Sequence, residues 1–194
     1  TKRYWYRDSP FLTTFWTTLS TLFPEGETFF VDSVRNYRHL VTDPLQKAQV
    51  SGFIGQESMH SKEHQAFNDL ADKHGFPASN LDRDLGYLLR FTRKALPKKI
   101  QLAITVALEH YTAILAEQLL RDSAHQENIQ DPGALKLWMW HALEENEHKV
   151  VAYDVYNLIG GGYLTRILTM LVVTFFFFSV VGIGHTRMLW ADGK

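Results

Sequence analysis

Two Glu-x-x-His pairs place a carboxylate and an imidazole one helical turn apart. They are Glu57 with His60 and Glu145 with His148. Side chains three residues apart lie on the same face of an α-helix, so both members of a pair can bind one metal ion. Carboxylates and imidazoles suit first-row metals such as iron and manganese. Each pair therefore predicts half of a metal site.

A lone glutamate on an apolar helical face precedes each pair. Glu27 shares its face with Phe30, and Glu109 shares its face with Ala113. The chain thus repeats one pattern, a helix with Glu followed by a helix with Glu-x-x-His. This is the inward-facing ligand set of ferritin-like di-iron and di-manganese helical bundles. We expect a dinuclear site with the metal ligands Glu27, Glu57, His60, Glu109, Glu145 and His148.

Two further histidines lie one turn from the expected ligands. His64 follows His60 by four residues, and His141 precedes Glu145 by four. One interpretation makes them orienting groups, which hold the ligands in place through hydrogen bonds. The other makes one or both of them metal ligands, in a site richer in nitrogen than a typical ferritin. The sequence leaves both interpretations open.

Neighbouring carboxylates offer alternatives to two of the ligands. Glu144 also lies within reach of the histidine on its helix, but Glu145 is nearer the centre of the apolar face and is preferred. Glu117 lies two turns beyond Glu109, and we expect it to be an exposed charge. A surface ion pair between Glu145 and Lys149 is the competing interpretation. The apolar residues that share the face favour a buried carboxylate instead.

Start and stop residues place these side chains on helices. Asp-Pro at positions 43–44 and 131–132 combines an N-cap with a proline in the first turn. Alternating strand patterns and hairpin turns are absent from the sequence. We therefore expect an all-α fold, a ferritin-like four-helix bundle with additional short helices. The expected helices span residues 9–23, 25–41, 44–74, 81–95, 97–125 and 131–160, with a polar loop at 122–133.

The C-terminal part is far more apolar than the rest. Residues 167–184 contain no charged side chain over 18 positions, and Arg166 and Arg187 flank them. Such a helix is about 27 Å long, close to the thickness of a bilayer core. It inserts into a membrane, forms a buried fifth helix or a homodimer interface, or lines a channel for a lipid-like substrate. We divide the chain into a bundle with the metal site at 1–160 and an apolar helix at 161–194, packed on the bundle or membrane-associated.

Composition excludes several classes of function. The net charge is −1 and the basic residues are dispersed, so no nucleic-acid partner is expected. The sequence contains no cysteine, which excludes disulfides, thiolate metal sites and cysteine nucleophiles. The first residue is Thr1 and no signal peptide is recognisable, so we expect a longer protein trimmed at both ends. A cytoplasmic location fits, with attachment to the inner face of the cytoplasmic membrane as an option.

Four sequence blocks carry a resemblance to a known family. They are FPEGETFF around Glu27, FIGQESMHSKEH around Glu57, ALEHYTAILAE around Glu109 and WMWHALEENEHKVVAYDVY around Glu145. The sequence resembles, over residues 4–169, the bacterial proteins described as predicted metal-dependent hydrolases, relatives of the ferritin-like superfamily. The resemblance implies hydrolysis by name. It also places His64, His141 and Glu144 in the family pattern together with the six expected ligands.

The ligand set supports three functions in order of preference. The first is a non-haem dinuclear enzyme, with two iron ions, that oxidises a small apolar substrate with O₂. The second is a metal-dependent hydrolase that uses a metal-bound hydroxide as nucleophile. The third is a non-catalytic iron-binding protein. Manganese or zinc can replace iron, because the same ligand types accept several metals.

Overall fold

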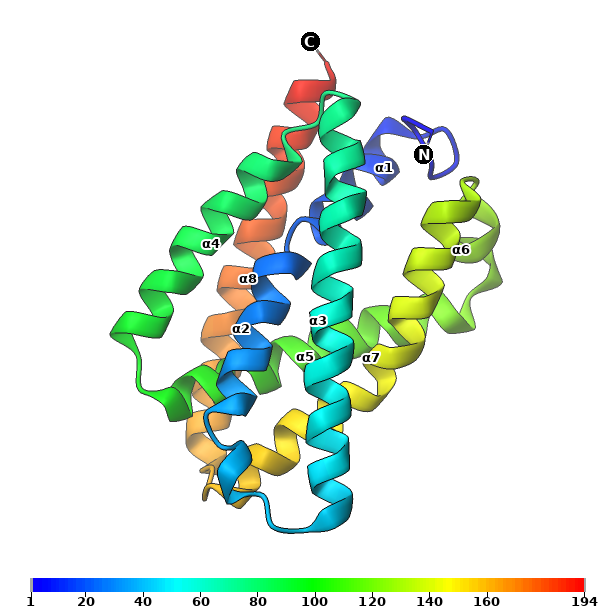
Figure 1. Cartoon of the computed structure of the whole chain (residues 1–194). Coiled ribbons are helices and arrows are strands. Elements are labelled where there is room, and N and C mark those ends of the chain that lie inside the picture. The colour runs from blue at the N-terminus through cyan, green and yellow to red at the C-terminus, as the bar shows by residue number, and fades with distance from the viewer. Residues whose placement is uncertain (1, 194) are drawn as a thin grey trace.

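The computed structural model describes residues 2–193, which form an all-α structure (Figure 1). One isolated β-bridge joins Tyr6 to Ile129, and the described residues form no longer strand. The helices are α1 (Pro10–Ser20), α2 (Phe23–Arg35), a 3₁₀ turn η1 (Arg38–Leu40), α3 (Pro44–Lys73), α4 (Ala78–Ala95), α5 (Lys98–Arg121), α6 (Ser123–Asn128), α7 (Pro132–Leu158) and α8 (Tyr163–Asp192).

Side-chain caps start the helices at the predicted positions. The side chain of Ser9 accepts a hydrogen bond from the backbone at the start of α1. Asp43 caps α3 and Asp131 caps α7 in the same way, and each is followed by proline. These contacts satisfy backbone N–H groups that have no partner within the helix. The capped starts fix the register of the two helices that carry Glu-x-x-His.

Two helix pairs form the body of the molecule. α2 packs along α3, and α5 packs along α7, so each helix with a lone glutamate lies beside the Glu-x-x-His helix that follows it in the predicted pattern. α3 also contacts α7, which brings the two Glu-x-x-His helices against each other. α3 lies at the front and α8 at the back of the view in Figure 1. The arrangement is a helical bundle whose four central helices are α2, α3, α5 and α7.

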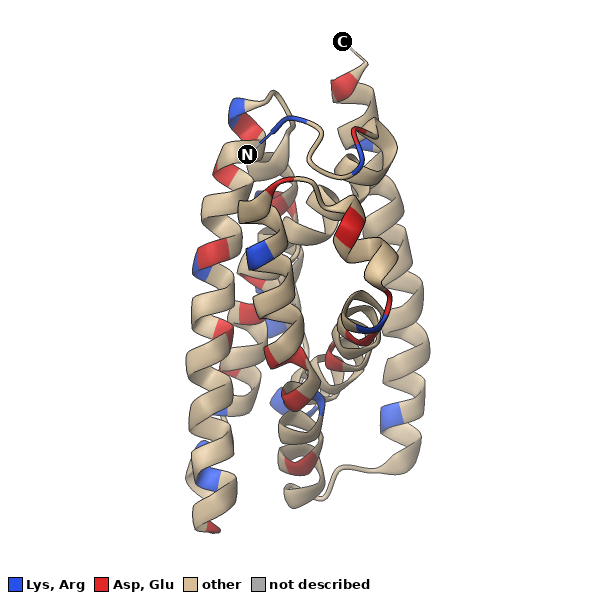
Figure 2. Ribbon diagram, turned by 90° about the vertical axis from the view of Figure 1, so that its right-hand side faces the viewer, with Lys and Arg blue, Asp and Glu red and all other residues tan. Residues whose placement is uncertain are grey.

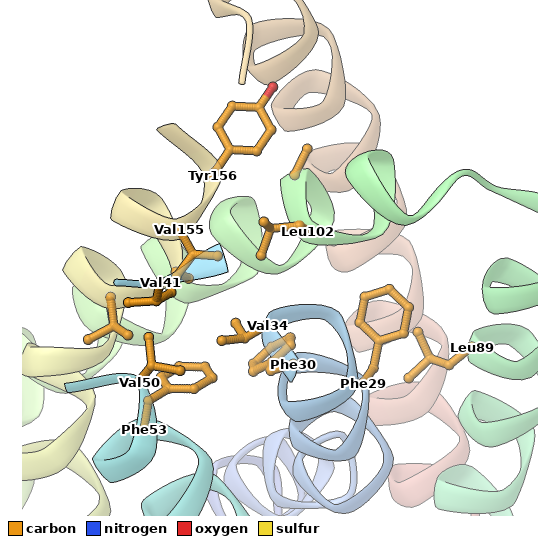
Figure 3. Close-up of a cluster of buried hydrophobic side chains, with 13 residues drawn as sticks. Phe29, Phe30, Val34, Val41, Val50, Phe53, Leu89, Leu102, Val155 and Tyr156 are labelled. Carbon is orange, nitrogen blue, oxygen red and sulfur yellow. The ribbon is translucent and has the colours of Figure 1, made fainter. Parts of the chain in front are cut away.

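The core of the described residues includes two large apolar clusters with a polar layer between them. One cluster includes Phe30, Phe53 and Val155 and lies where α3 begins (Figure 3). The other includes Phe67 and Trp138 and lies towards the chain's N-terminus. Along α3, Glu57, His60 and His64 fall between Phe53 and Phe67, and the other long helices follow the same plan. The buried polar groups therefore have packed apolar side chains at both ends.

Several predicted helix boundaries are wrong. The first helix ends at Ser20 instead of residue 23, and Pro24 does not end it. Pro24 lies in the first turn of α2, where the missing N–H of proline breaks no helical hydrogen bond. The helix predicted at 25–41 stops at Arg35 and is followed by the short turn η1. The helix predicted to reach residue 125 stops at Arg121. Asp122 then adopts an extended backbone and caps the extra helix α6 within the predicted loop.

The C-terminal helix is longer than the apolar run that predicted it. α8 packs against α1 and α5 and forms one edge of the molecule in Figure 2. Its mean hydropathy is 2.4 in its most apolar 18-residue window, and 17% of that window is buried. Length and composition would allow it to cross a membrane, the one helix among residues 2–193 that meets both conditions. Most of its apolar surface therefore faces outward.

Asp82 on α4 is a partly buried carboxylate outside the bundle centre. Its burial changes the free energy of unfolding with pH. Burial raises the pKa of Asp82 from 3.8 to about 6, and the carboxylate of Glu25 adds to the effect. The folded pKa exceeds the unfolded one, so the ionised form costs stability above pH 6, and the cost fades as the pH falls towards 3.8. Asp82 is partly exposed, so solvent screens part of this cost.

We predict that Asp82→Asn stabilises the protein by about 1 kcal/mol at pH 7.5, a rise in Tm of about 2–4 °C. The gain should fall to about half at pH 5, because wild-type Asp82 is then largely protonated. Thermal unfolding at both pH values measures it. Glu63→Gln on the exposed face of α3 is the control. A gain that is equal at the two pH values would contradict the burial explanation.

Candidate metal centre

The six predicted ligands come together at the centre of the bundle. Each is nearly inaccessible to solvent, with at most 2% of its surface exposed. α2 and α5 contribute one glutamate each, and α3 and α7 contribute one Glu-x-x-His pair each. The side chains are Glu27, Glu57, His60, Glu109, Glu145 and His148.

Two overlapping groups of side chains have metal-ligand spacing. Glu57, His60, Glu145 and His148 each offer an atom within 4.8 Å of the atoms of the others. Glu27, His60 and His141 form the second group by the same measure. His141 is thus placed with the expected ligands. The cluster is large enough, and buried enough, to bind metal ions.

Most polar atoms in this cluster have no hydrogen-bond partner among residues 2–193. They include both carboxylate oxygens of Glu27, Glu57 and Glu109. One ring nitrogen of each of His60, His141 and His148 is also without a partner. Leaving such groups buried and unpaired costs roughly 1–3 kcal/mol each, and more when they are charged. Bound cations would remove this cost, so the residues present fit a metal centre.

The hydrogen bond of Glu144 determines which nitrogen of His60 faces the cluster. His60 Nε2 lies 2.8 Å from Glu144 Oε2. A carboxylate can only accept here, so Nε2 carries the proton and Nδ1 keeps its lone pair. Nδ1 lies 3.5 Å from Glu145 Oε1 and 3.9 Å from Glu57 Oε2. Glu144 therefore lies outside the cluster and orients His60, while Glu145 lies inside.

Gln56 orients the ring of His148 in the same way that Glu144 orients the ring of His60. The Gln56 carbonyl oxygen Oε1 accepts a hydrogen bond from His148 Nε2 at 3.1 Å. His148 Nδ1 then faces Glu57 Oε1 at 2.8 Å and Glu145 Oε1 at 3.4 Å. Such bonds to the outer nitrogen fix ring orientation at metal sites. The spacing of the ligands does not predict a role for Gln56, since it adjoins Glu57 without sharing its face.

A chain of hydrogen bonds from α1 fixes the tautomer of His141. The Asn68 amide donates to the Ser20 carbonyl at 3.1 Å, and the Ser20 hydroxyl donates to Asn68 Oδ1 at 2.7 Å. Ser20 Oγ can then only accept from His64 Nδ1, at 2.8 Å. His64 Nε2 in turn accepts from His141 Nδ1 at 2.7 Å. His141 Nε2 is left with a lone pair, 3.1 Å from Glu145 Oε1.

Two acceptors that face each other need a cation between them. His141 Nε2 and Glu145 Oε1 are such a pair, because neither carries a proton in this tautomer. His64 does not face the carboxylates but supports His141 from outside the cluster. The sequence missed Ser20 and Asn68. Asn68 lies one turn beyond His64 on the same helical face, whereas nothing in the local sequence distinguishes Ser20.

Burial and mutual repulsion set the protonation of the carboxylates. Burial raises the pKa of Glu27 and Glu109 well above its usual range, and the neighbouring carboxylates add to it. Burial acts on Glu145 in the same direction, but the three histidine side chains beside it outweigh burial and hold its pKa well below normal. Burial lowers the pKa of His148, and Glu145 and Glu57 overcome this and raise it to about 10.

A small apolar cavity reaches the cluster from the α1 side. Its volume is about 30 Å³, enough for a water molecule or a methyl group. His141 and Glu145 form its polar end. Trp16, Phe23 and Trp138 are among the apolar side chains that line the rest. The cavity connects the ligand cluster to an apolar environment.

The remaining candidates lie outside the cluster. Glu117 pairs with Arg121 at 2.7 Å on the exposed side of α5, as predicted. His125 bonds the Tyr6 hydroxyl at 2.7 Å, and His185 contacts α1. Glu117, His125 and His185 do not belong to the metal-ligand groups found in the described part of the chain.

Comparison with known proteins identifies a family over the full length. The family model described as "Predicted metal-dependent hydrolase" matches residues 1–194. No curated protein and no solved structure matches the chain. The expected oxidation of a substrate with O₂ by a di-iron enzyme is therefore wrong, because the family is one of predicted hydrolases. The match agrees with the hydrolase alternative.

The opposite orientations of the two adjacent glutamates on α7 give a test. We predict that Glu145→Gln lowers the bound metal per chain by more than half, because Glu145 faces three of the histidines. Glu144→Gln should retain most of the metal and bind it roughly 10-fold more weakly, as expected for a group that only orients a ligand. Metal analysis after dialysis, with a binding titration, measures both.

Glu147→Gln, on the exposed side of α7, is the matched control and should change neither quantity. Full metal content in Glu145→Gln would exclude the cluster as the binding site.

Proposed function

We propose that the buried cluster binds two metal ions and hydrolyses a small substrate, because the chain belongs to the family of predicted metal-dependent hydrolases. The observation that carries the proposal is the set of unpartnered carboxylate oxygens and imidazole nitrogens at the bundle centre. A structural polar network would satisfy these atoms internally. Here the partners are on the outer side of each ring, and the inner atoms are left for cations.

The ligand assignment follows from the orientation of each ring. One ion would be held by the group around His148 and Glu57, with Glu109 beside them, and the other by the group around His141 and Glu27. Glu145 lies close to histidines of both groups. The proposed ligands are Glu27, Glu57, His60, Glu109, His141, Glu145 and His148, with Gln56, His64 and Glu144 as orienting groups.

We also assign the central bundle to the ferritin-like type. The order Glu, Glu-x-x-His, Glu, Glu-x-x-His over α2, α3, α5 and α7 supports this assignment. Each helix directs its ligand inward, as in carboxylate-bridged dinuclear bundles. His141 adds a third nitrogen to that set, so the donor atoms suit zinc as well as manganese and iron.

The metal ions, when bound, would acidify water and polarise the bond that is cleaved. The chain itself supplies a site without bulk water, because the ligands are buried between two apolar clusters. A low-dielectric surrounding strengthens the interactions between these charged groups. The apolar cavity next to His141 and Glu145 favours a substrate with a small apolar group beside the bond that is hydrolysed.

Hydrolysis in the absence of O₂ is the decisive experiment. The protein is loaded with zinc or manganese under anaerobic conditions and assayed with chromogenic esters, amides and phosphoesters that carry short apolar groups. We expect turnover with either metal, loss of turnover with a chelator, and recovery when metal is returned.

Glu145→Gln, treated with the same metals, controls for hydrolysis by free or loosely bound ions. Activity that is equal in this variant and in the wild type would overturn the proposal. So would the absence of hydrolysis of every substrate class by protein that holds its full complement of metal.

The hydrogen-bond chain from α1 predicts an effect at a distance from the ligands. Ser20→Ala should weaken metal binding by about 10-fold or more, because His64 and then His141 lose their fixed tautomers. Ser33→Ala is the matched control, since Ser33 is equally buried but bonds Thr105 instead. A competition titration with a metal indicator compares them. Equal losses in the two variants would show a general effect on stability and contradict the assigned role.

A further inference from the structure

The outer face of α8 is an apolar stripe without a partner in the chain. Figure 2 shows no acidic or basic residue on this helix over most of its length. Positions spaced three or four apart fall on one face of a helix. The stripe formed in this way is more than half exposed at every position and consists of Leu164, Leu168, Leu171, Val172, Phe175 and Phe178.

The inner face of α8 is bonded to the bundle along its length. The hydroxyls of Thr174 and Tyr111 are 2.6 Å apart, and the Tyr111 ring stacks on Phe177. Towards the other end, His185 Nε2 lies 3.1 Å from Thr14 Oγ1. A helix that left the bundle to span a bilayer would break these contacts. α8 therefore keeps its inner face on the protein, and only the outer stripe can be covered by something else.

A cationic groove runs beside the stripe, between α5, α7 and α8. Its volume is about 370 Å³. Lys149 and Arg166 line it, together with apolar side chains that include Val106, Ile167 and Met170. The described lining residues include no carboxylate. The groove thus combines an apolar floor with two positive charges, next to an apolar helix surface.

Tyrosine rings hold one of these charges in position. The Arg166 guanidinium lies 5.0 Å from the centre of the Tyr153 ring and 5.5 Å from that of Tyr163. A guanidinium held over aromatic rings is positioned in advance for an anion, and phosphate oxygens suit its geometry. The adjacent Lys149 adds a second positive charge at the same end of the stripe.

We propose that α8 docks the protein onto the surface of an anionic phospholipid bilayer. The helix lies parallel to the membrane, with its outer stripe among the acyl chains and with Lys149 and Arg166 bound to lipid phosphates. Apolar side chains on one face and cations beside them are the features of helices that bind in the interfacial plane. A second copy of the chain is a poorer occupant, because it would bring the same positive charges to the same surface.

Vesicle co-sedimentation with the full chain tests the proposal. Wild-type protein should sediment with vesicles of phosphatidylglycerol and phosphatidylcholine, and much less with phosphatidylcholine alone. The double variant Leu171→Asp/Phe175→Asp should lose at least 10-fold in affinity, because it places two charges in the lipid-facing stripe. Leu45→Asp on α3 is the matched control, since Leu45 is 69% exposed and Leu171 is 63% exposed.

The charges are tested separately. Lys149→Gln should weaken binding to anionic vesicles roughly fivefold and leave the weak binding to neutral vesicles unchanged. Lys62→Gln on the exposed face of α3 is its control. Circular dichroism confirms that each variant is folded.

Two outcomes would overturn the proposal. One is equal sedimentation of the stripe variant and the Leu45→Asp control with anionic vesicles. The other is a wild-type dimer in sedimentation velocity that Leu171→Asp/Phe175→Asp converts to monomer, with no sedimentation on either kind of vesicle. The second result would assign the stripe to a second copy of the chain.

Discussion

The desolvation of four carboxylates and their histidines is the constraint on which this structure depends. Charged groups removed from water are tolerated only when other charges or hydrogen bonds compensate them. The chain meets the requirement by concentrating all of these groups in one layer across four helices, with apolar clusters at both ends. Their unpartnered atoms face one another across the layer. The described side chains supply only part of the positive charge that would balance these carboxylates.

Each histidine in the layer is held by a different kind of acceptor on its outer side. Glu144 accepts from His60, the Gln56 amide oxygen accepts from His148, and the neutral ring of His64 accepts from His141. The acceptors differ in charge but have the same consequence: in the neutral ring, the nitrogen with the lone pair faces inward.

The sequence predicted the parts of this site that depend on helical periodicity. The spacing of Glu57 with His60 and of Glu145 with His148 was sufficient, because three residues always make close to one turn. The capped helix starts at Asp43 and Asp131 could also be predicted, because each cap forms its hydrogen bond within its own helix. The contribution of Ser20 could not be predicted, because it depends on how α1 crosses α3, 44 residues away in the chain. The short helix α6 was missed because its polar sequence resembles a loop.

Helix α1 contacts α8 on one side and α3, which carries His64, on the other. Four of its side chains between Thr13 and Thr18 are threonines, and hydroxyls such as those of Thr14 and Thr18 bond back to their own backbone. α8 comes so close to α1 at this point that a Cβ added to Gly184 would lie 2.9 Å from Thr18. On the other side, Ser20 reaches His64. α1 therefore separates the outer helix from the layer of ligands. A wider side chain at Thr18 would push α8 away from α1, because no room is left at Gly184.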